Sequence, residues 1–337
     1  MTHPTYYKKF KCIANLCPDS CCKDWDVVVD SKTEAFYNSI NTDFGEKLRS
    51  LMLTDSDGDR IFKSKNGKCP FWNADMLCDI YINLGEEHLC ETCKSFPRIT
   101  QDYGAFTEKL LSFACPEAAR LILAEDDAYT DFKSDYELDN TYYNADVMRF
   151  ILKAREKTAQ ILNDSAYSFA ENLKDCLAFN SQIQDALNGN EPSHLGEIPQ
   201  KMDCGFIFDL HLRLEIMDNS FAAELTEIAK KCENLKISKA LDDKFKKLAL
   251  YYVYRYYLTA IDSDDVLGTI KRIVCAYIII GKWAAFRDSR GDKDILKIMQ
   301  RYSKEVEHSY ENNEELDFEF AANPNFSVEN LISAIGD

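Results

Sequence analysis

The sequence has little glycine and an excess of acidic over basic residues, and each feature excludes a class of protein. With 12 glycines in 337 residues and no glycine-rich strand–helix turn, the cradle of a Rossmann-like nucleotide fold is not expected. The 57 acidic and 40 basic residues give a net charge of −17, which repels phosphate backbones. We therefore expect neither nucleic acid nor an anionic membrane surface as a partner.

Long hydrophobic runs are also lacking. The longest apolar run, Ile273 to Ile280, lies between Arg272 and Lys282, and a bilayer crossing needs about 20 residues. The amino terminus has neither the apolar core nor the cleavage site of a secretory signal. We expect a cytoplasmic protein, in which thiols stay reduced and disulfides are rare.

Cysteine is abundant and unevenly placed. Of the 13 cysteines, four are scattered singly through apolar helical patterns and are expected to be buried small side chains: Cys176, Cys204, Cys232 and Cys275. The other nine lie in the first 115 residues, in the patterns C-x4-C-x3-C-C and C-x8-C-x11-C-x2-C followed by one more: Cys12, Cys17, Cys21, Cys22, Cys69, Cys78, Cys90, Cys93 and Cys115. In a reducing compartment this clustering predicts metal ligands.

The choice of metal depends on the donor set. Only one C-x2-C knuckle is present, Cys90 to Cys93, and His3 and His88 are the only histidines of this region. An all-thiolate supply with irregular spacing favours a [4Fe–4S] cluster, with zinc as the alternative. The thiols suffice for two four-coordinate centres.

The residues next to the cysteines predict how the thiols point. Cys17, Cys69 and Cys115 each precede proline, which favours an extended backbone at the cysteine. Cys115 also stands where the N-cap of a helix "PEAARLIL" would be, and the positive helix end would favour its thiolate. Successive side chains diverge, so Cys21 and Cys22 are expected to serve different sites, or only one of them to bind.

The fold is predicted to be mainly α, with three parts. Residues 1–123 form a cysteine-rich metal- or iron–sulfur-binding domain with irregular loops. The acidic stretch 124–140 is a linker, and residues 141–337 form an all-helical domain. Apolar residues at helical spacing predict helices over 146–162, 245–260, 269–286 and 294–306. Residues 188–200 read as a loop, and Ser327 as the N-cap of a last helix.

Three segments carry a family resemblance. "FKCIANLCPDSCCKDWDVVVD", "CPFWNADMLCDIYINLGEEHLCETCKSFPRI" and "LSFACPEAARL", within residues 6–123, resemble the flagellin lysine-N-methylases, which belong to a group of zinc- or iron-chelating cysteine-rich domains. The resemblance implies a bacterial cytoplasmic protein-lysine N-methyltransferase that acts on flagellin, uses S-adenosyl-L-methionine and holds an iron–sulfur cluster. By position, the implied metal ligands are Cys12, Cys17, Cys21, Cys22, Cys69, Cys78, Cys93 and Cys115. Cys90 departs from the family pattern and is an extra thiol.

The sequence leaves the catalytic and donor-binding residues unknown. The C-x3-C-x2-C motif of radical S-adenosylmethionine enzymes begins at Cys17 and Cys21 but fails at Asp24. If the reaction is an ordinary methyl transfer, a carboxylate or a tyrosine could take the lysine proton. The tyrosine-rich helix offers five candidates, each of which also suits a structural role: Tyr251, Tyr252, Tyr254, Tyr256 and Tyr257. The alternative function is a non-enzymatic zinc- or iron-binding module on a helical scaffold.

Overall fold

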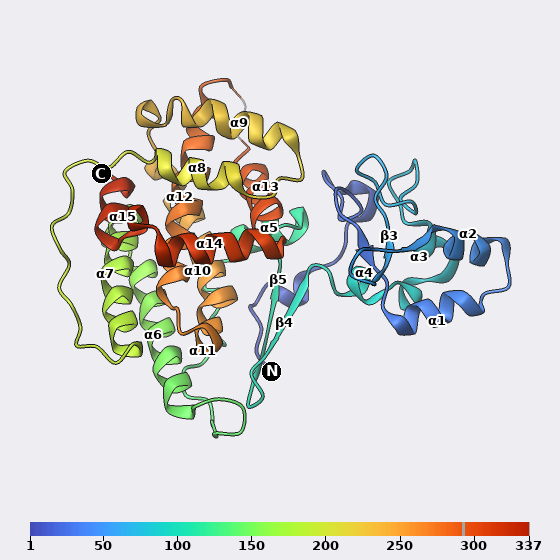
Figure 1. The fold of residues 1–337 in the computed structure, drawn as a ribbon, viewed down its shortest axis with the longest axis horizontal. Helices are drawn as coiled ribbons and strands as arrows, with labels where there is room; N and C mark the ends of the chain where they lie inside the picture. Colours follow the sequence, from blue (N-terminus) through green and yellow to red (C-terminus); the bar gives the residue numbers. More distant parts are fainter. Residues whose placement is uncertain (292–293, 337) are drawn as a thin grey trace.

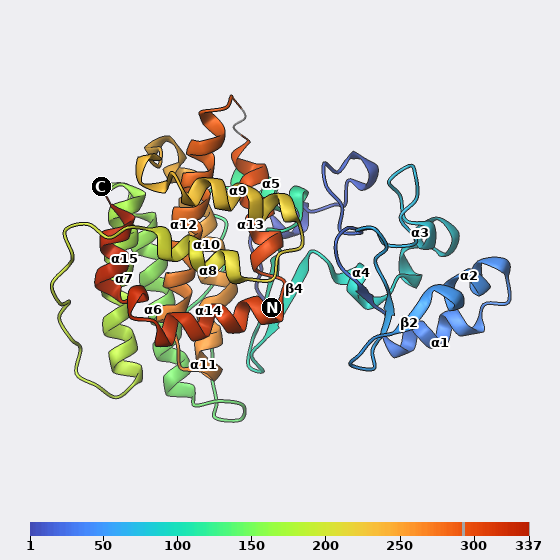
Figure 2. The same ribbon diagram turned by 45° about the horizontal axis from the view of Figure 1, so that its top comes forward.

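The computed structural model describes residues 1–291 and 294–336, which form two lobes joined at a narrow junction (Figures 1 and 2). The small lobe is made by residues 11–97, and its buried core runs from Val27 to Cys90. The large lobe is made by residues 1–10 and 98–336, whose apolar side chains form a second, larger core. The cysteine-rich segment therefore has a core of its own.

The small lobe combines short helices with a three-stranded antiparallel sheet of strand order β1-β3-β2. Asp30 and Thr42 cap its two longest helices by accepting hydrogen bonds from backbone N–H groups of the first turn. In chain order the elements are η2 (Ala14–Leu16), β1 (Val27–Val28), α1 (Ser31–Ser39), α2 (Asp43–Leu51), β2 (Met52–Thr54), β3 (Arg60–Phe62), α3 (Asp79–Leu84), η3 (Glu86–His88) and α4 (Glu91–Ser95).

A β-hairpin leads from the small lobe into the large one. Its strands are β4 (Arg98–Asp102) and β5 (Thr107–Leu111), which pair in register from Arg98↔Leu111 to Asp102↔Thr107. Helix α5 (Pro116–Ala124) follows, and both elements add apolar side chains to the core of the large lobe. This core continues across the predicted boundaries at residues 123 and 140. The division of the chain into three domains stays a prediction.

Helices form the rest of the large lobe. The longest, α12 (Leu267–Asp288), is buried along most of its length and packs against α7, α10 and α13. The remaining elements are η1 (Tyr7–Lys9), α6 (Ala145–Asn163), α7 (Phe169–Leu187), α8 (Gly205–Arg213), α9 (Asn219–Ala229), η4 (Cys232–Asn234), η5 (Lys239–Leu241), α10 (Asp242–Tyr256), η6 (Tyr257–Thr259), α11 (Ala260–Ser263), α13 (Ile295–Val306), α14 (Tyr310–Ala322), η7 (Pro324–Phe326) and α15 (Val328–Ile335).

The predicted mainly-α fold is confirmed. The four predicted helices correspond to α6, α10, α12 and α13, and Ser327 caps α15 by accepting a hydrogen bond from Asn330 N–H. Residues 188–204 form no helix or strand. None of the helices in the described part of the chain combines the length and apolarity that a bilayer crossing needs.

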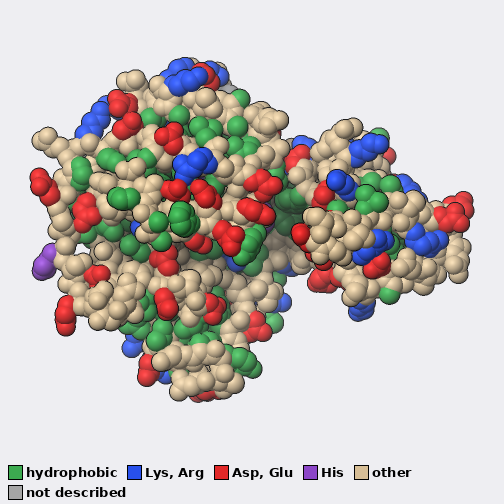
Figure 3. Space-filling view, viewed as in Figure 1, with side chains coloured by type: hydrophobic (Ala, Val, Ile, Leu, Met, Phe, Trp, Pro, Cys, Tyr) green, Lys and Arg blue, Asp and Glu red, His purple; other side chains and the backbone are tan. Residues whose placement is uncertain are grey.

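Acidic side chains are scattered over the face of the large lobe in Figure 3, whereas several basic side chains lie on the same face of the small lobe. On this face the acidic side chains are thus spread out rather than gathered in one patch.

Candidate functional site

The nine front cysteines, which are those of the first 115 residues, lie in loops and at or near helix starts. The backbone N–H of Cys69 donates to the carbonyl oxygen of Cys22 at 2.8 Å, which joins the two cysteine-bearing segments of the small lobe. Cys78, Cys90 and Cys115 stand at the N-caps of α3, α4 and α5. The sequence predicted this position for Cys115 alone.

The backbone is extended, as predicted, at two of the cysteines that precede proline. Cys17 has φ −69° and ψ 130°, and Cys115 has φ −84° and ψ 123°. Proline excludes the helical conformation at the preceding residue, so these two sulfurs are held by a stiff local backbone.

Four thiols form a first group at the junction of the lobes: Cys12, Cys17, Cys21 and Cys115. Burial raises the pKa of Cys17, and the negative charges of Asp19, Cys21 and Cys12 act in the same direction. Burial also raises the pKa of Cys115 to about 12, with contributions from Cys17 and Cys21. Cys17 thus interacts with Cys12 and Cys21, and Cys115 interacts with Cys17 and Cys21, which links the four thiols in one group.

Five thiols form a second group inside the small lobe: Cys22, Cys69, Cys78, Cys90 and Cys93. Burial raises the pKa of Cys69 to about 11, and Cys78 and Cys90 raise it further. A hydrogen bond with Cys90 is the largest cause of the raised pKa of Cys93, to which burial, Cys22 and Cys78 add. Cys90, the extra thiol of the sequence pattern, therefore lies among predicted ligands.

The adjacent pair lies where the two groups meet. Cys21 acts on Cys17 and Cys115 of the first group and also on Cys69 and Cys78 of the second, and Cys22 acts on Cys93. A hydrogen bond between Cys21 and Cys22 is the largest cause of the raised pKa of Cys21. This arrangement suits two neighbouring centres, and the assignment of the ligands stays a prediction.

The donor set consists of thiols alone, which suits an iron–sulfur cluster or zinc. His3 stacks on Tyr7 and His88 stacks on Phe36, so both histidines have aromatic partners. Within residues 1–291 and 294–336, the one trio of His, Cys, Asp or Glu whose ligand atoms all lie within 4.8 Å of one another is elsewhere, at Asp203, Cys204 and Cys232.

Helix α13 holds the adjacent cysteines against the large lobe. Lys304 Nζ lies 3.1 Å from Asp19 Oδ2 and 3.2 Å from Asp24 Oδ2, and these aspartates flank Cys21 and Cys22 in the sequence. One turn earlier, Gln300 Nε2 donates to the carbonyl oxygen of Ala114 at 2.7 Å. The same helix therefore contacts both chain segments that supply the first thiol group.

A buried carboxylate follows directly after α13. Glu307 is 8% exposed and accepts hydrogen bonds from three phenols: Tyr251 Oη at 2.9 Å, Tyr252 Oη at 3.2 Å and Tyr256 Oη at 2.8 Å. A carboxylate at this end of a helix faces the negative end of the helix dipole and loses solvation on burial. The three phenols offset that cost and fix the carboxylate in place.

Next to this carboxylate, His308 links the large lobe to the small one. Its Nε2 lies 2.8 Å from Ser112 Oγ, three residues before Cys115, and its ring packs against Trp25 and Phe96. Burial lowers the pKa of His308, so its ring is neutral at pH 7. Tyr251 Oη, which donates to Glu307, also accepts from Phe113 N–H at 3.4 Å. His308 and the tyrosine partner of Glu307 thus both contact the segment that leads to Cys115.

The five candidate tyrosines have different partners: three donate to Glu307 and two contact other residues. Burial raises the pKa of Tyr251, Tyr252 and Tyr256, and the charge of Glu307 raises it further. At neutral pH these three are hydrogen-bond donors rather than bases. Tyr254 lies under the guanidinium of Arg155, and Tyr257 Oη donates to Asn180 Oδ1 at 2.6 Å.

Sequence reasoning missed Glu307 and His308. Each is a single residue without a motif, and nothing in "KEVEHSY" distinguishes Glu307 from Glu305. The tyrosine density of α10 is the only signal that could have led to the carboxylate.

A cavity of about 260 Å³ opens between residues 125–130 and α10. Acidic side chains from the connecting segment, Lys246, Lys247 and Tyr254 line it. Its volume falls below the roughly 300–1,000 Å³ that is usual for ligand pockets, and we assign no ligand to it.

Comparison with known proteins identifies the class. The sequence model described as the FliB lysine N-methylase C-terminal domain matches residues 209–334, which include α13, Glu307 and His308.

Two curated relatives from Salmonella are similar to the chain. It is 34% identical over 134 residues to a lysine-N-methylase of Salmonella typhimurium and to the flagellar biosynthetic protein FliU of Salmonella muenchen. The match takes in 38% of this chain, 33% of the lysine-N-methylase and 79% of FliU. The chain belongs to the FliB lysine N-methylase family. It covers a third of the length of the lysine-N-methylase, and no solved structure matches it.

Proposed function

We propose that the chain is a protein-lysine N-methyltransferase that acts on flagellin in the cytoplasm, takes its methyl group from S-adenosyl-L-methionine and holds an iron–sulfur cluster. Membership of the FliB lysine N-methylase family supports the reaction class. The observation that carries the proposal within the structure is the buried Glu307, held by three phenols beside the segment that leads to Cys115.

Methyl transfer to lysine asks for a neutral amine in line with the sulfonium methyl. The amine nitrogen forms a bond to the methyl carbon while the carbon–sulfur bond breaks, and one proton must leave the nitrogen. A fixed carboxylate can accept that proton. We assign this role to Glu307, with Tyr251, Tyr252 and Tyr256 as donors that position it. Holding the reactants in line is the larger part of such catalysis.

The first thiol group would hold the cluster: Cys12, Cys17, Cys21 and Cys115. When bound, an iron–sulfur cluster supplies a one-electron centre and a rigid core that orders the loops around it. The second thiol group has enough sulfurs for a separate centre, which iron or zinc could occupy.

The experiment measures label transfer from S-adenosyl-L-methionine to flagellin by the whole chain, purified without oxygen. Glu307→Gln removes the proton acceptor but keeps the side-chain shape, and we expect the rate to fall about 10²–10⁴-fold. Glu305→Gln is the matched control, because Glu305 is also buried but accepts from the backbone N–H of Met217. Melting temperatures of both variants show whether each remains folded.

The outcomes separate the two candidate functions. Transfer by the native chain, lost in Glu307→Gln and kept in Glu305→Gln, supports the enzyme with the assigned base. Equal rates in native chain and Glu307→Gln would remove Glu307 from the mechanism. A native chain that contains metal but neither binds the donor in calorimetry nor transfers label would instead be the non-enzymatic metal-binding module.

A further inference from the structure

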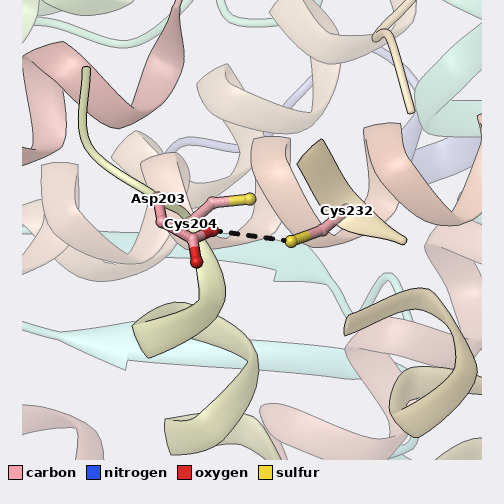
Figure 4. A group of neighbouring side chains, drawn as sticks. All are labelled: Asp203, Cys204 and Cys232. Atoms are coloured by element: carbon pink, nitrogen blue, oxygen red, sulfur yellow. Dashed lines mark hydrogen bonds between the residues drawn. The ribbon is translucent and has the colours of Figure 1, made fainter. Parts of the chain in front are cut away.

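Asp203, Cys204 and Cys232 meet inside the large lobe, and none of the front cysteines belongs to this trio. Their ligand atoms all lie within 4.8 Å of one another, and Cys232 Sγ is 3.7 Å from Asp203 Oδ1 (Figure 4). Both cysteines are buried, at 5% and 3% exposure, while Asp203 is exposed. The trio is therefore closed on its thiol side and open to water on its carboxylate side.

Two separate connections bring the three residues together. Asp203 and Cys204 end the irregular segment 188–204, and Cys204 stands at the N-cap of α8. Cys232 begins η4, just after α9. Asp203 Oδ1 also accepts a hydrogen bond from Gly205 N–H at 3.0 Å, which fixes the carboxylate toward the helix start. The start of α8 thus holds both Asp203 and Cys204 in place.

The spacing suits a small thiophilic cation. Zinc binds cysteine sulfur at about 2.3 Å and carboxylate oxygen at about 2.0–2.2 Å in a tetrahedron, which puts sulfur and oxygen roughly 3.6 Å apart. The observed Sγ···Oδ1 distance is 3.7 Å. We propose that Asp203, Cys204 and Cys232 bind a zinc ion, with a water molecule as the fourth ligand on the exposed side of Asp203.

Such a zinc ion would tie the end of the 188–204 segment to the connection between α9 and α10. Since the three ligands come together only in the folded chain, the free energy of zinc binding adds to the stability of the large lobe. Lys282, whose charge acts on both cysteines, donates from Nζ to the carbonyl oxygen of Leu235 at 2.6 Å. Its ammonium group is thus held by the connection that follows Cys232.

The test compares zinc content between matched double variants of the whole chain. After stripping with a chelator under reducing, oxygen-free conditions, each protein is loaded with zinc alone, and bound zinc is measured by elemental analysis. We expect Cys204→Ser with Cys232→Ser to hold one zinc fewer than the native chain. Cys176→Ser with Cys275→Ser removes two other buried thiols of the large lobe and should hold as much as the native chain. Because the front cysteines are unchanged in both, the difference reports this trio.

Asp203→Asn provides a second variant that leaves the cores intact, because Asp203 is exposed. We expect it to bind the same zinc at least about 10-fold more weakly, because a charged oxygen ligand becomes a neutral amide and loss of even an outer-shell partner costs about 10–100-fold. Equal zinc content in the two double variants would overturn the proposal. A disulfide between Cys204 and Cys232 would also overturn it. That disulfide would appear as an intact mass two hydrogen atoms below that of the reduced chain, measured without oxygen, and as a Cys204–Cys232 linked peptide in peptide mapping.

Discussion

Lys304 joins the lobes, and replacing it tests how the cysteine segment is held. Its ammonium lies between Asp19 and Asp24 at 3.1 and 3.2 Å and 5.8 Å from the centre of the Trp25 ring. Lys304→Met keeps the apolar stem of the side chain but removes the charge. Both carboxylates then lose their shared partner, and the segment that carries Cys21 and Cys22 loses its anchor.

The structure sets the size of the effect between two limits. Exposed ion pairs contribute about 0.2–1 kcal/mol, whereas breaking a buried pair costs about 3–5 kcal/mol. The Lys304 side chain is 8% exposed, but the aspartates are 23% and 26% exposed. We therefore expect Lys304→Met to lower the free energy of unfolding by about 2 kcal/mol at pH 7, between the surface and buried limits.

The ion pair between Lys304 and Asp19 predicts that the stability cost of Lys304→Met depends on pH. Burial raises the pKa of Asp19, but Lys304 and the Ser20 backbone N–H outweigh it and hold the pKa below its ordinary value. A lowered carboxyl pKa stabilises the fold above the unfolded value of about 3.9, and that contribution is lost as the pH falls through the folded pKa. The cost of Lys304→Met should therefore stay nearly constant from pH 7 to about pH 5 and shrink as the pH falls below about 4, through the folded pKa of Asp19.

Urea unfolding of the native chain, Lys304→Met and Lys297→Met measures both effects. Lys297 lies exposed on the same helix, so its replacement should change the free energy by less than about 0.5 kcal/mol. Iron content after anaerobic purification reports whether the first thiol group depends on this anchor. A cost for Lys304→Met no larger than that of Lys297→Met, or one that does not change with pH, would refute the reasoning.

Three further predictions concern other parts of the chain. Arg155→Met leaves Glu108 buried without its bidentate partner at 2.7 and 2.8 Å, so chemical denaturation should show a loss of about 3–5 kcal/mol. Replacing both by Met should restore most of it. Ser168→Ala removes the capping box of α7 and should cost about 1 kcal/mol, seen as a lower melting temperature. Cys17→Ser should lose bound iron and visible absorbance, and Cys69→Ser should lose bound metal, while Cys275→Ser keeps both metal and absorbance; unchanged metal in the first two would contradict the ligand assignment.

The helical part of the fold could be predicted because its signals are local. Apolar spacing marked α6, α10, α12 and α13, and Ser327 marked the start of α15. The hairpin β4–β5 was missed, although Gly104, at φ +70°, punctuates the two strands. Each strand has only five residues, and the cysteine-rich pattern around them predicted irregular loops instead.

The candidate sites were predictable only where their residues cluster in the sequence. The front cysteines cluster in the sequence, and in the structure they form two groups. Cys204 and Cys232 each look like a single buried cysteine, and both are buried as expected. That they meet beside Asp203 depends on how α8 and α9 pack. Glu307 likewise meets tyrosines more than 50 residues away, a contact that no local spacing records.

The thiol groups and the carboxylate are mechanically connected, because both depend on one short stretch of chain. Helix α13 pairs with Asp19 and Asp24 through Lys304 and contacts Ala114 through Gln300, and Glu307 and His308 follow its last residue. Ser112, bound to His308, leads within three residues to Cys115. If a metal orders Cys17, Cys21 and Cys115, it also fixes the segment against which Glu307 and His308 rest. Under the proposed function, a bound metal need not take part in methyl transfer: it is sufficient that the metal positions Glu307.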